Sequence, residues 1–320
     1  ALQNNMETIG IQMTYCNLET EQTKYFREEF SFEEIKKWFD DLMEEYGKWA
    51  TFQCEMKNQR QASIKELGFP FEYRPGQKKL VSDVYRTIMR QKLLFMQAPT
   101  GVGKTISTIF PAVKAVGEEL ADRIFYLTAK TITATVAKET FALLEKNGYR
   151  AKTIQITAKE KLCPCDEMEC NPVTCPYAKG HFDRVNDAVF DLLHRCEMIE
   201  RDDILSQADR YTVCPFELCL DTASWCDNII CDYNYVFDPN VYLKRFFQEG
   251  IKGDYIFLID EAHNMVERSR QMYSAQIYKE DFLTVKRIMK EHSRSIEKAL
   301  EKCNKILLGM KRECENYTVY

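Results

Sequence analysis

The sequence predicts an α/β protein with a doubly wound parallel sheet and a cysteine-rich, mainly helical insertion. Three observations indicate this fold class. Short apolar runs alternate with stretches of helical periodicity, which is typical of a parallel sheet covered by helices. A glycine-rich loop at Ala98–Thr105 precedes an acidic DEAH box at Asp260–His263. Nine of the 13 cysteines fall between Cys163 and Cys231, in the interval between these two motifs.

The composition is that of a globular chain with a sizeable core. The 320 residues are 45% apolar and 29% charged, which excludes disorder and low complexity. A net charge of -5 gives no overall attraction for nucleic acid, so such a partner would need a local basic surface. No apolar run of about 18 residues occurs, and Ala1–Gly10 has no signal-peptide pattern. Together with the many cysteines, this predicts reduced thiols and a cytoplasmic location.

Two predicted segments precede the main sheet. Residues 1–30 contain an alternating apolar stretch, which predicts one strand at the end of an upstream domain. Ser31 and Glu34 form a capping-box pattern, which predicts the start of a long amphipathic helix. We interpret residues 31–70 as a helical connector. The aromatic residues placed on its apolar face are Trp38 and Trp49.

The predicted sheet domain comprises residues 71–160 and 228–278, with residues 161–227 as the insertion. Buried parallel strands are typically short apolar runs, and such runs recur here. The predicted elements are a helix Gln77–Arg90, a strand Leu93–Gln97, a helix from Gly103, and strands Ile124–Thr128, Ile229–Cys231 and Tyr255–Ile259. Residues 279–320 predict one or two charged helices.

The segment Ala98–Thr105 has the pattern of a phosphate-binding loop, or P-loop, between a strand and a helix. Gly101 and Gly103 allow the backbone N–H groups to turn toward phosphate oxygens, and the helix N-terminus adds a favourable dipole. We expect Lys104 to reach the β and γ phosphates and Thr105 to ligate Mg²⁺. Two further predicted nucleotide-binding residues of the loop are Thr100 and Val102.

The acidic box follows the apolar run Tyr255–Ile259 directly. At the end of a strand, Asp260 can hold Mg²⁺ through water, and Glu261 can orient or deprotonate the attacking water. His263 is either a plain helix-start residue or a relay of the state of the γ phosphate. With the P-loop upstream, we predict an ATP hydrolase whose catalytic residues are Lys104, Asp260, Glu261 and His263.

Four motifs within about residues 69–278 resemble superfamily 2 DNA helicases of the XPD and DinG type. These motifs are Arg74-Pro-Gly-Gln77, APTGVGKT, Tyr126-Leu-Thr-Ala-Lys130 and Asp260-Glu-Ala-His-Asn264. The resemblance implies a RecA-like helicase domain 1 in which Gln77 contacts adenine and Thr128–Thr131 touches the DNA backbone. It also implies ATP and Mg²⁺ as cofactors, single-stranded or forked DNA as the partner, and 5′ to 3′ movement in DNA repair or replication.

The resemblance sets an expected extent as well. No motif after the acidic box matches a second motor domain with its arginine finger, so we expect about half a motor with poor turnover on its own. Residues 279–320 are expected to begin an arch-like helical insertion. The upstream strand and helix resemble the end of a nuclease-like domain, to which we assign no functional residues.

The same family carries a 4Fe-4S domain between the corresponding motifs, and proline after cysteine is familiar at cluster ligands. The implied ligands are Cys163, Cys170, Cys175 and Cys214. Cys165 could replace Cys163. A zinc site of four thiolates is an open alternative, because zinc also favours tetrahedral sulfur. A mixed site with His181 or His194 is a weaker one.

Two other functions compete with the helicase interpretation. One is a non-catalytic nucleic-acid-binding repair scaffold with a zinc or iron–sulfur site. The retention of Lys104, Thr105, Asp260 and Glu261 argues against it, because a scaffold has no need of all four. The other is a P-loop metabolic kinase, which the DEAH box and the cysteine-rich insertion disfavour.

Overall fold

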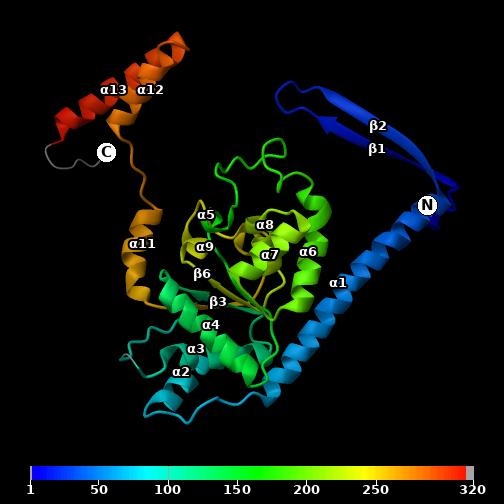
Figure 1. The fold of residues 1–320 in the computed structure, drawn as a ribbon, viewed down its shortest axis with the longest axis vertical. Helices are drawn as coiled ribbons and strands as arrows, with labels where there is room; N and C mark the ends of the chain where they lie inside the picture. The colour runs from blue at the N-terminus through cyan, green and yellow to red at the C-terminus, as the bar shows by residue number, and fades with distance from the viewer. Residues whose placement is uncertain (1, 100, 315–320) are drawn as a thin grey trace. The chain divides into compact units, whose positions relative to one another are not determined.

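The computed structural model describes residues 2–99 and 101–314 and divides the chain into two compact units. The chain crosses between the units at Asp232/Tyr233, Leu243/Lys244 and Asp260/Glu261. The first unit contains an N-terminal hairpin, the main sheet and the cysteine-rich segment (Figure 1). The second unit contains a short segment before residue 244 and the helices that follow the sheet.

The elements of the first unit alternate between helix and strand after the long helix α1. The N-terminal part contains a 3-10 helix Leu2–Asn4, β1 Thr8–Cys16, β2 Thr23–Ser31, α1 Phe32–Glu66 and α2 Gln77–Met89. The following part contains α3 Lys104–Gly117, β3 Arg123–Leu127, α4 Thr131–Lys146 and β4 Thr153–Gln155. The remaining elements are α5 Lys159–Leu162, α6 His181–Arg195, β5 Met198–Ile199, α7 Arg201–Tyr211, α8 Pro215–Ala223, β6 Asn228–Cys231, α10 Lys244–Phe247 and β7 Tyr255–Ile259.

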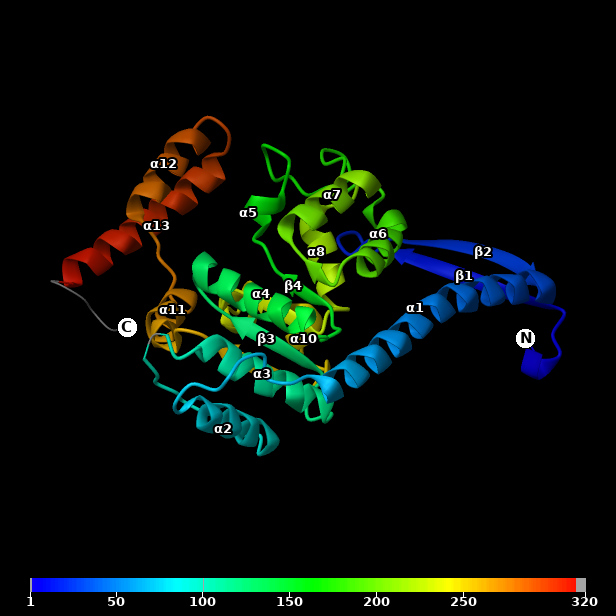
Figure 2. The same cartoon turned by 60° about the horizontal axis from the view of Figure 1, so that its bottom comes forward.

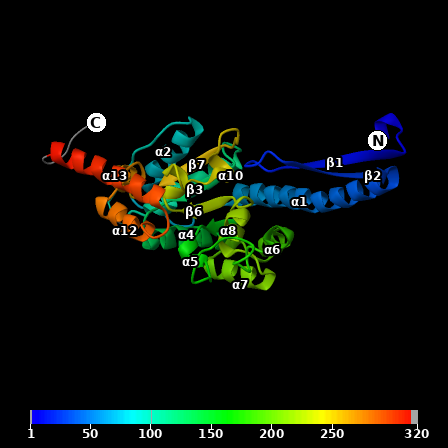
Figure 3. The same cartoon turned by 90° about the horizontal axis from the view of Figure 1, so that it is seen from above.

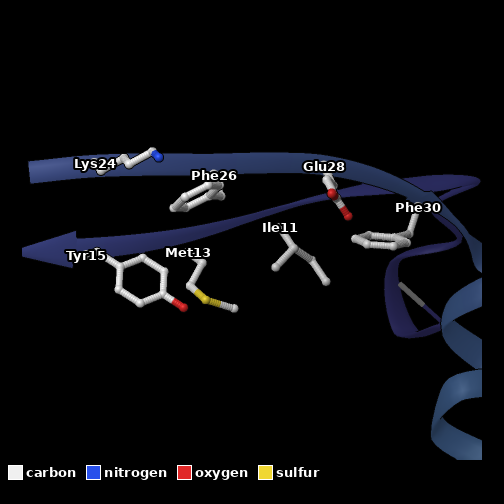
Figure 4. Close-up of a pocket in the computed structure, with 7 residues that line it drawn as sticks. All are labelled: Ile11, Met13, Tyr15, Lys24, Phe26, Glu28 and Phe30. Carbon is white, nitrogen blue, oxygen red and sulfur yellow. The ribbon is translucent and has the colours of Figure 1, made fainter. Parts of the chain in front are cut away.

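The N-terminal hairpin pairs β1 with β2 in antiparallel register, from Thr8 opposite Ser31 to Cys16 opposite Thr23. The predicted first strand is confirmed, and β2 is an addition. Its sequence did not predict a strand, because Tyr25 and Phe26 are adjacent and break the alternation. One face of the hairpin forms a shallow apolar groove (Figure 4). The side chains that line it are Ile11, Met13, Tyr15, Lys24, Phe26, Glu28 and Phe30.

Helix α1 begins where the sequence predicted. The Ser31 hydroxyl accepts from the Glu34 N–H at 3.3 Å, and Glu34 Oε2 accepts from the Ser31 N–H at 2.8 Å. These reciprocal bonds form a capping box. The 35-residue helix runs along the first unit (Figure 3). Near its end, the buried Arg60 forms an ion pair with Asp227, which anchors α1 to the sheet.

The main sheet is parallel throughout, with the strand order β5-β4-β6-β3-β7. The predicted strands at β3, β6 and β7 are confirmed, because each is a short apolar run placed next to another. Strands β4 and β5 were not predicted from the sequence. They are three and two residues long, so they carry too little periodicity to be distinguished from a loop.

The predicted strand Leu93–Gln97 is wrong. This segment has no regular secondary structure, and Leu93 and Phe95 are each 88% exposed. An apolar run predicts burial, but a strand also needs a neighbour to accept its backbone hydrogen bonds. In the described sheet, β7 is the last strand on this side and pairs only with β3.

The two faces of the sheet are covered differently. Helices α3 and α4 lie beside the sheet (Figure 2), and their side chains form one core with alternate residues of β3, including Ile124 and Tyr126. The other face carries an aromatic cluster around the fully buried Phe125. Phe246 of α10 and Phe257 of β7 approach it with ring centroids 5.3 and 5.5 Å away.

The predicted insertion is mainly helical, as expected, and it also joins the sheet. Helices α6, α7 and α8 pack on one another. Strand β5 lies between α6 and α7 in the sequence and pairs with β4, Thr153 opposite Met198. Met198 and Ile199 thereby extend the sheet at one end. The insertion is therefore continuous with the main sheet through hydrogen-bonded strands.

The second unit contains α9 Asn234–Phe237, a 3-10 helix Ala262–Asn264, α11 Met265–Met272, α12 Lys279–Met289 and α13 Arg294–Glu313. The charged segment that the sequence predicted as one or two helices forms two, α12 and α13, which pack against each other. Across the residues that the structure describes, no helix is long and apolar enough to cross a membrane.

Candidate nucleotide site and cysteine site

The P-loop has the backbone conformation that its glycines predicted. Gly101 and Gly103 have φ values of 86° and 72°, in the left-handed region that favours glycine. Gly103 is the N-cap of α3, and Lys104 and Thr105 are the first residues of the helix. Lys104 Nζ donates to the Ala98 carbonyl at 3.3 Å, so the ammonium folds over the loop. The predicted site residue Thr100 lies outside the described residues.

The buried Gln77 forms a side-chain hydrogen bond to the backbone of the P-loop. Its Oε1 accepts from the Arg74 N–H at 3.1 Å, and its Nε2 donates to the Val102 carbonyl at 3.2 Å. The Arg74 guanidinium donates to the Gly101 carbonyl. A Cβ atom at Gly103 would lie 2.9 Å from Gln77 Nε2, so only glycine allows this contact. Sequence analysis singled out Gln77 but missed the loop contact of Arg74.

Asp260 lies at the carboxyl end of β7. Its N–H donates to the Leu127 carbonyl at 3.0 Å, which continues the β3–β7 ladder by one residue. Both strands are parallel, so Asp260 and Thr128 follow strand ends on the same edge of the sheet. This edge is where a phosphate-binding fold places its ligand.

Glu261 is held in a backbone conformation that is rare for a residue other than glycine. Its φ is 49° and its ψ is 43°, in the left-handed region. Its carbonyl accepts from the Asn264 N–H at 2.9 Å and from the Tyr233 hydroxyl at 3.4 Å. Its carboxylate Oε2 lies 3.4 Å from Nδ1 of His263, which is exposed. These bonds fix the turn that carries two of the predicted catalytic side chains.

The segment expected to touch DNA divides into a buried and an exposed part. The hydroxyl of the buried Thr128 bonds to the Thr133 hydroxyl and accepts from the Lys130 N–H at 3.3 Å. Thr128 therefore shapes the turn. Lys130 and Thr131 are exposed and can reach a partner.

Cys214 lies at the start of a helix, where backbone N–H groups approach its sulfur. It is the N-cap of α8, followed by Pro215 at the first helical position. Burial raises the pKa of its thiol, and hydrogen bonds from the N–H groups of Glu217 and Phe216 act in the opposite direction. Free N–H groups at the start of a helix therefore face a sulfur that would ligate a metal.

The other predicted ligands lie on the segment between α5 and α6. Burial raises the pKa of the Cys165 thiol to about 11, and contacts with Cys175 and Cys163 add to this. Cys170 contacts Lys159, and its hydrogen bond is the main cause of a raised Lys159 pKa. Lys159 also interacts with Cys214.

These thiols do not form one preformed coordination group. Within residues 2–99 and 101–314, no three His, Cys, Asp or Glu side chains stand close enough together to hold a metal ion. The segment from Cys163 to Gly180 contains turns but no helix or strand, so its backbone does not fix the sulfur positions. The donor set itself fits iron–sulfur ligation, because thiolates are its standard protein ligands.

The two histidines weighed as ligands have other partners. His181 Nδ1 accepts from the Cys214 N–H at 3.2 Å, and burial lowers the His181 pKa. His194 Nδ1 lies 2.7 Å from the Phe190 carbonyl, and its ring packs on Phe52 with centroids 4.6 Å apart. These contacts favour thiolates alone as the metal ligands.

A parallel sheet with a P-loop at the start of a helix is typical of nucleotide-binding proteins. Residues 138–282 match the DEAD_2 family. Over 248 residues the sequence is 20% identical to Regulator of telomere elongation helicase 1 of Rattus norvegicus, covering 62% of this chain and 19% of the rat protein. Over 232 residues it is 23% identical to the General transcription and DNA repair factor IIH helicase subunit XPD/RAD3 of Saccharomyces cerevisiae, covering 62% and 29%.

A solved structure named XPD_Helicase has a TM-score of 0.50 and 18% identity to this chain, which shows a shared fold. It covers 74% of this chain and 40% of that one. Together these matches confirm the predicted resemblance to XPD-type superfamily 2 helicases. It spans 19% and 29% of the length of the two curated relatives.

Proposed function

We propose that this chain is the nucleotide-binding part of a DNA helicase that couples Mg-ATP hydrolysis to 5′ to 3′ movement on single-stranded DNA and to opening of forked DNA. The observation that carries the proposal is the P-loop held by Gln77 and Arg74 at the start of α3. The names of its helicase relatives, one of them a subunit of a DNA repair factor, support the DNA substrate and a role in repair.

The proposed roles follow from the chemistry of each side chain. The backbone from residue 100 to Gly103 binds phosphate oxygens, and Lys104 neutralises the β and γ phosphates. Thr105 and Asp260 hold Mg²⁺, while Glu261 orients the attacking water. His263, in contact with Glu261, keeps this carboxylate in place.

Gln77 is proposed to serve both the loop and the nucleotide. Its two polar ends already bind the backbone at Arg74 and Val102, so it sets the position of the loop. An adenine contact would exchange one of these bonds. Binding of the base would then change the conformation of the phosphate loop.

We further propose that Cys163, Cys170, Cys175 and Cys214 hold a 4Fe-4S cluster. A cluster held by these thiolates would cross-link the segment before α6 to the start of α8, a structural and redox role rather than a hydrolytic one. The helix N-terminus at Cys214 supports this assignment. Cys165, beside Cys163 and Cys175, is the alternative ligand.

ATP turnover by the full-length protein, measured with and without single-stranded DNA, tests the motor. We expect Lys104→Ala to abolish DNA-stimulated turnover, a loss of about 100-fold or more. Lys79→Ala, an exposed lysine of α2, is the matched control and should match wild type. DNA binding without turnover in the wild type would instead support the scaffold function.

An anaerobic preparation, assayed for iron, sulfide and zinc, tests the cysteine site. We expect about four iron and four sulfide per chain and visible absorption near roughly 400 nm. Stoichiometric zinc without sulfide would replace the cluster with a zinc site held by the same thiolates.

A further inference from the structure

The buried side chain of His181 contacts the backbone of Cys214, a predicted cluster ligand. His181 is the first residue of α6 and only 4% exposed. Its Nδ1 accepts a hydrogen bond from the backbone N–H of Cys214, 33 residues later in the chain, at 3.2 Å. Because Nδ1 is the acceptor, the proton of the neutral ring is on Nε2. The imidazole therefore fixes the backbone of one predicted cluster ligand.

The other side of the ring continues this connection. His181 Nε2 faces Asp221 Oδ2 at 3.8 Å. Asp221 forms an ion pair with Arg245, and Arg245 NH2 also bonds to Glu217 Oε2 at 2.9 Å. Asp221 and Glu217 both belong to α8, the helix that Cys214 caps. Arg245 thus forms ion pairs with two residues of this helix.

Arg245 belongs to α10, which contacts the sheet directly. The next residue, Phe246, packs edge to face on Phe125 of β3 with ring centroids 5.3 Å apart. The segment after α10 leads to β7 and Asp260. A continuous set of contacts therefore joins the Cys214 backbone to the sheet of the nucleotide-binding fold.

We propose that His181 is a positioning residue of the cysteine site, holding Cys214 in place and linking it through Asp221 to Arg245. The inference rests on the proposed cluster. The alternative role for a buried histidine is packing alone. The two roles differ in what they require: positioning needs an acceptor at Nδ1, whereas packing needs only volume.

The physical consequence concerns both stability and redox behaviour of the site. With its N–H engaged by His181, Cys214 cannot use that N–H to bond a cluster sulfur. Hydrogen bonds to cluster sulfurs help set reduction potentials. Without His181 Nδ1 as acceptor, the Cys214 backbone is held less firmly and its N–H is free to bond a cluster sulfur. The reduction potential of the cluster should therefore rise.

The experiment compares three test variants and one control variant of the full-length protein with wild type, all purified anaerobically. His181→Leu removes the acceptor, and His181→Asn keeps an oxygen near the Nδ1 position. Arg245→Gln breaks the outer link at a side chain that is 35% exposed, so it should fold normally. His194→Leu, on the same helix, is the matched control. The readouts are the rate of iron release to a chelator and the midpoint potential of the cluster.

We expect His181→Leu to release iron about 10-fold faster than wild type and to have a higher midpoint potential. Loss of a residue that hydrogen-bonds to a metal ligand typically lowers metal affinity by about 10-fold or more. His181→Asn should stay within about 2-fold of wild type, and Arg245→Gln should fall between the two. The control should behave like wild type.

Three outcomes would overturn the proposal in distinguishable ways. A wild type without iron removes the cluster and this inference together. A wild type with iron and a His181→Leu variant that releases it at the same rate removes only the role of His181. Equal iron loss in the leucine and asparagine variants also removes it, because the effect then follows volume rather than hydrogen bonding. If His181→Leu does not fold, Arg245→Gln decides: iron release at the wild-type rate counts against the link.

Discussion

Asp191 shows how single residues hold the insertion together. On α6, its Oδ2 accepts from Gln207 Nε2 at 2.9 Å and pairs with Arg210 at 2.9 Å, both on α7. We expect Asp191→Asn to lower the free energy of unfolding at pH 7 by about 1 kcal/mol, since the carboxylate is partly screened by solvent. Denaturant titration measures this, with the exposed Asp187→Asn of the same helix as control.

The effect of Asp191→Asn should depend on pH. The hydrogen bond from Gln207, followed by the charges of Arg210 and Arg195, lowers the Asp191 pKa below its ordinary value of 3.8. A lowered pKa means that the stabilisation is present above 3.8 and is lost as pH falls through the folded-state pKa. The difference between variant and wild type should shrink below this pH. A constant difference from pH 7 to pH 2.5 or so would contradict the assignment.

At the residue scale, the residues of a known motif could be predicted from the sequence, whereas side-chain contacts between separate segments could not. Gly101, Gly103 and Lys104 are recognisable because binding of a phosphate group dictates the spacing of such residues in a P-loop. The contact between Arg74 and the Gly101 carbonyl carries no such pattern, since it depends on how a turn meets the loop. The bond from Cys214 to His181 joins residues far apart in sequence, so only the fold could show it.

Helix α1 and the insertion meet through aromatic rings. Trp49 lies 4.4 Å from Trp225 and 5.0 Å from Phe190, measured between ring centroids. Trp38, placed on the same apolar face by the sequence, is instead 64% exposed. Helical periodicity identifies a face but not how far along the helix a partner extends, which explains the difference.

These two tryptophans give a matched test of the contact. We expect Trp49→Ala to lower the free energy of unfolding by about 2 kcal/mol and to speed hydrogen exchange in α6, because a half-buried ring cluster is lost. Trp38→Ala should change either quantity little. Similar effects of the two substitutions would mean that the ring cluster adds nothing beyond the helix itself.

Elements defined by local chemistry were predictable, and those defined by neighbours were not. The capping box of Ser31 and Glu34 fixed the start of α1. Strands β3, β6 and β7 followed from apolar runs. By contrast, β4 and β5 exist because neighbouring strands accept their few hydrogen bonds, and Leu93–Gln97 has the composition of a strand without such a neighbour in the described sheet.

For the whole molecule, the insertion is connected to the main sheet and to α1 at several points of the first unit. Strand β5 pairs with β4, and Asp227, the last residue of the insertion, forms an ion pair with Arg60 of α1. The mostly buried Lys152, beside β4, donates to the Cys196 carbonyl at 2.9 Å. The P-loop has no part in these contacts. Changes at the cysteine site should therefore affect strand separation before they affect nucleotide binding.

Cys214→Ala tests this separation of roles in the full-length protein. We expect loss of the visible absorption and most of the iron, and loss of unwinding of forked DNA, because one of four ligands is missing. Nucleotide affinity should stay within about 3-fold of wild type, since Gln77 and Arg74 hold the loop independently.

Cys219→Ala is the control for this experiment. Cys219 is five residues further along, on α8, and is 1% exposed. Burial raises its thiol pKa to about 11 and also raises that of Cys214, so the two residues differ in that only Cys214 belongs to the predicted ligand set. This variant should lose about 1 kcal/mol of stability but keep its iron and its unwinding activity. If Cys214→Ala kept full absorption and unwinding, Cys214 would not be a ligand. If it lost nucleotide binding as well, the cysteine site would support the P-loop itself, and the two functions could not be separated.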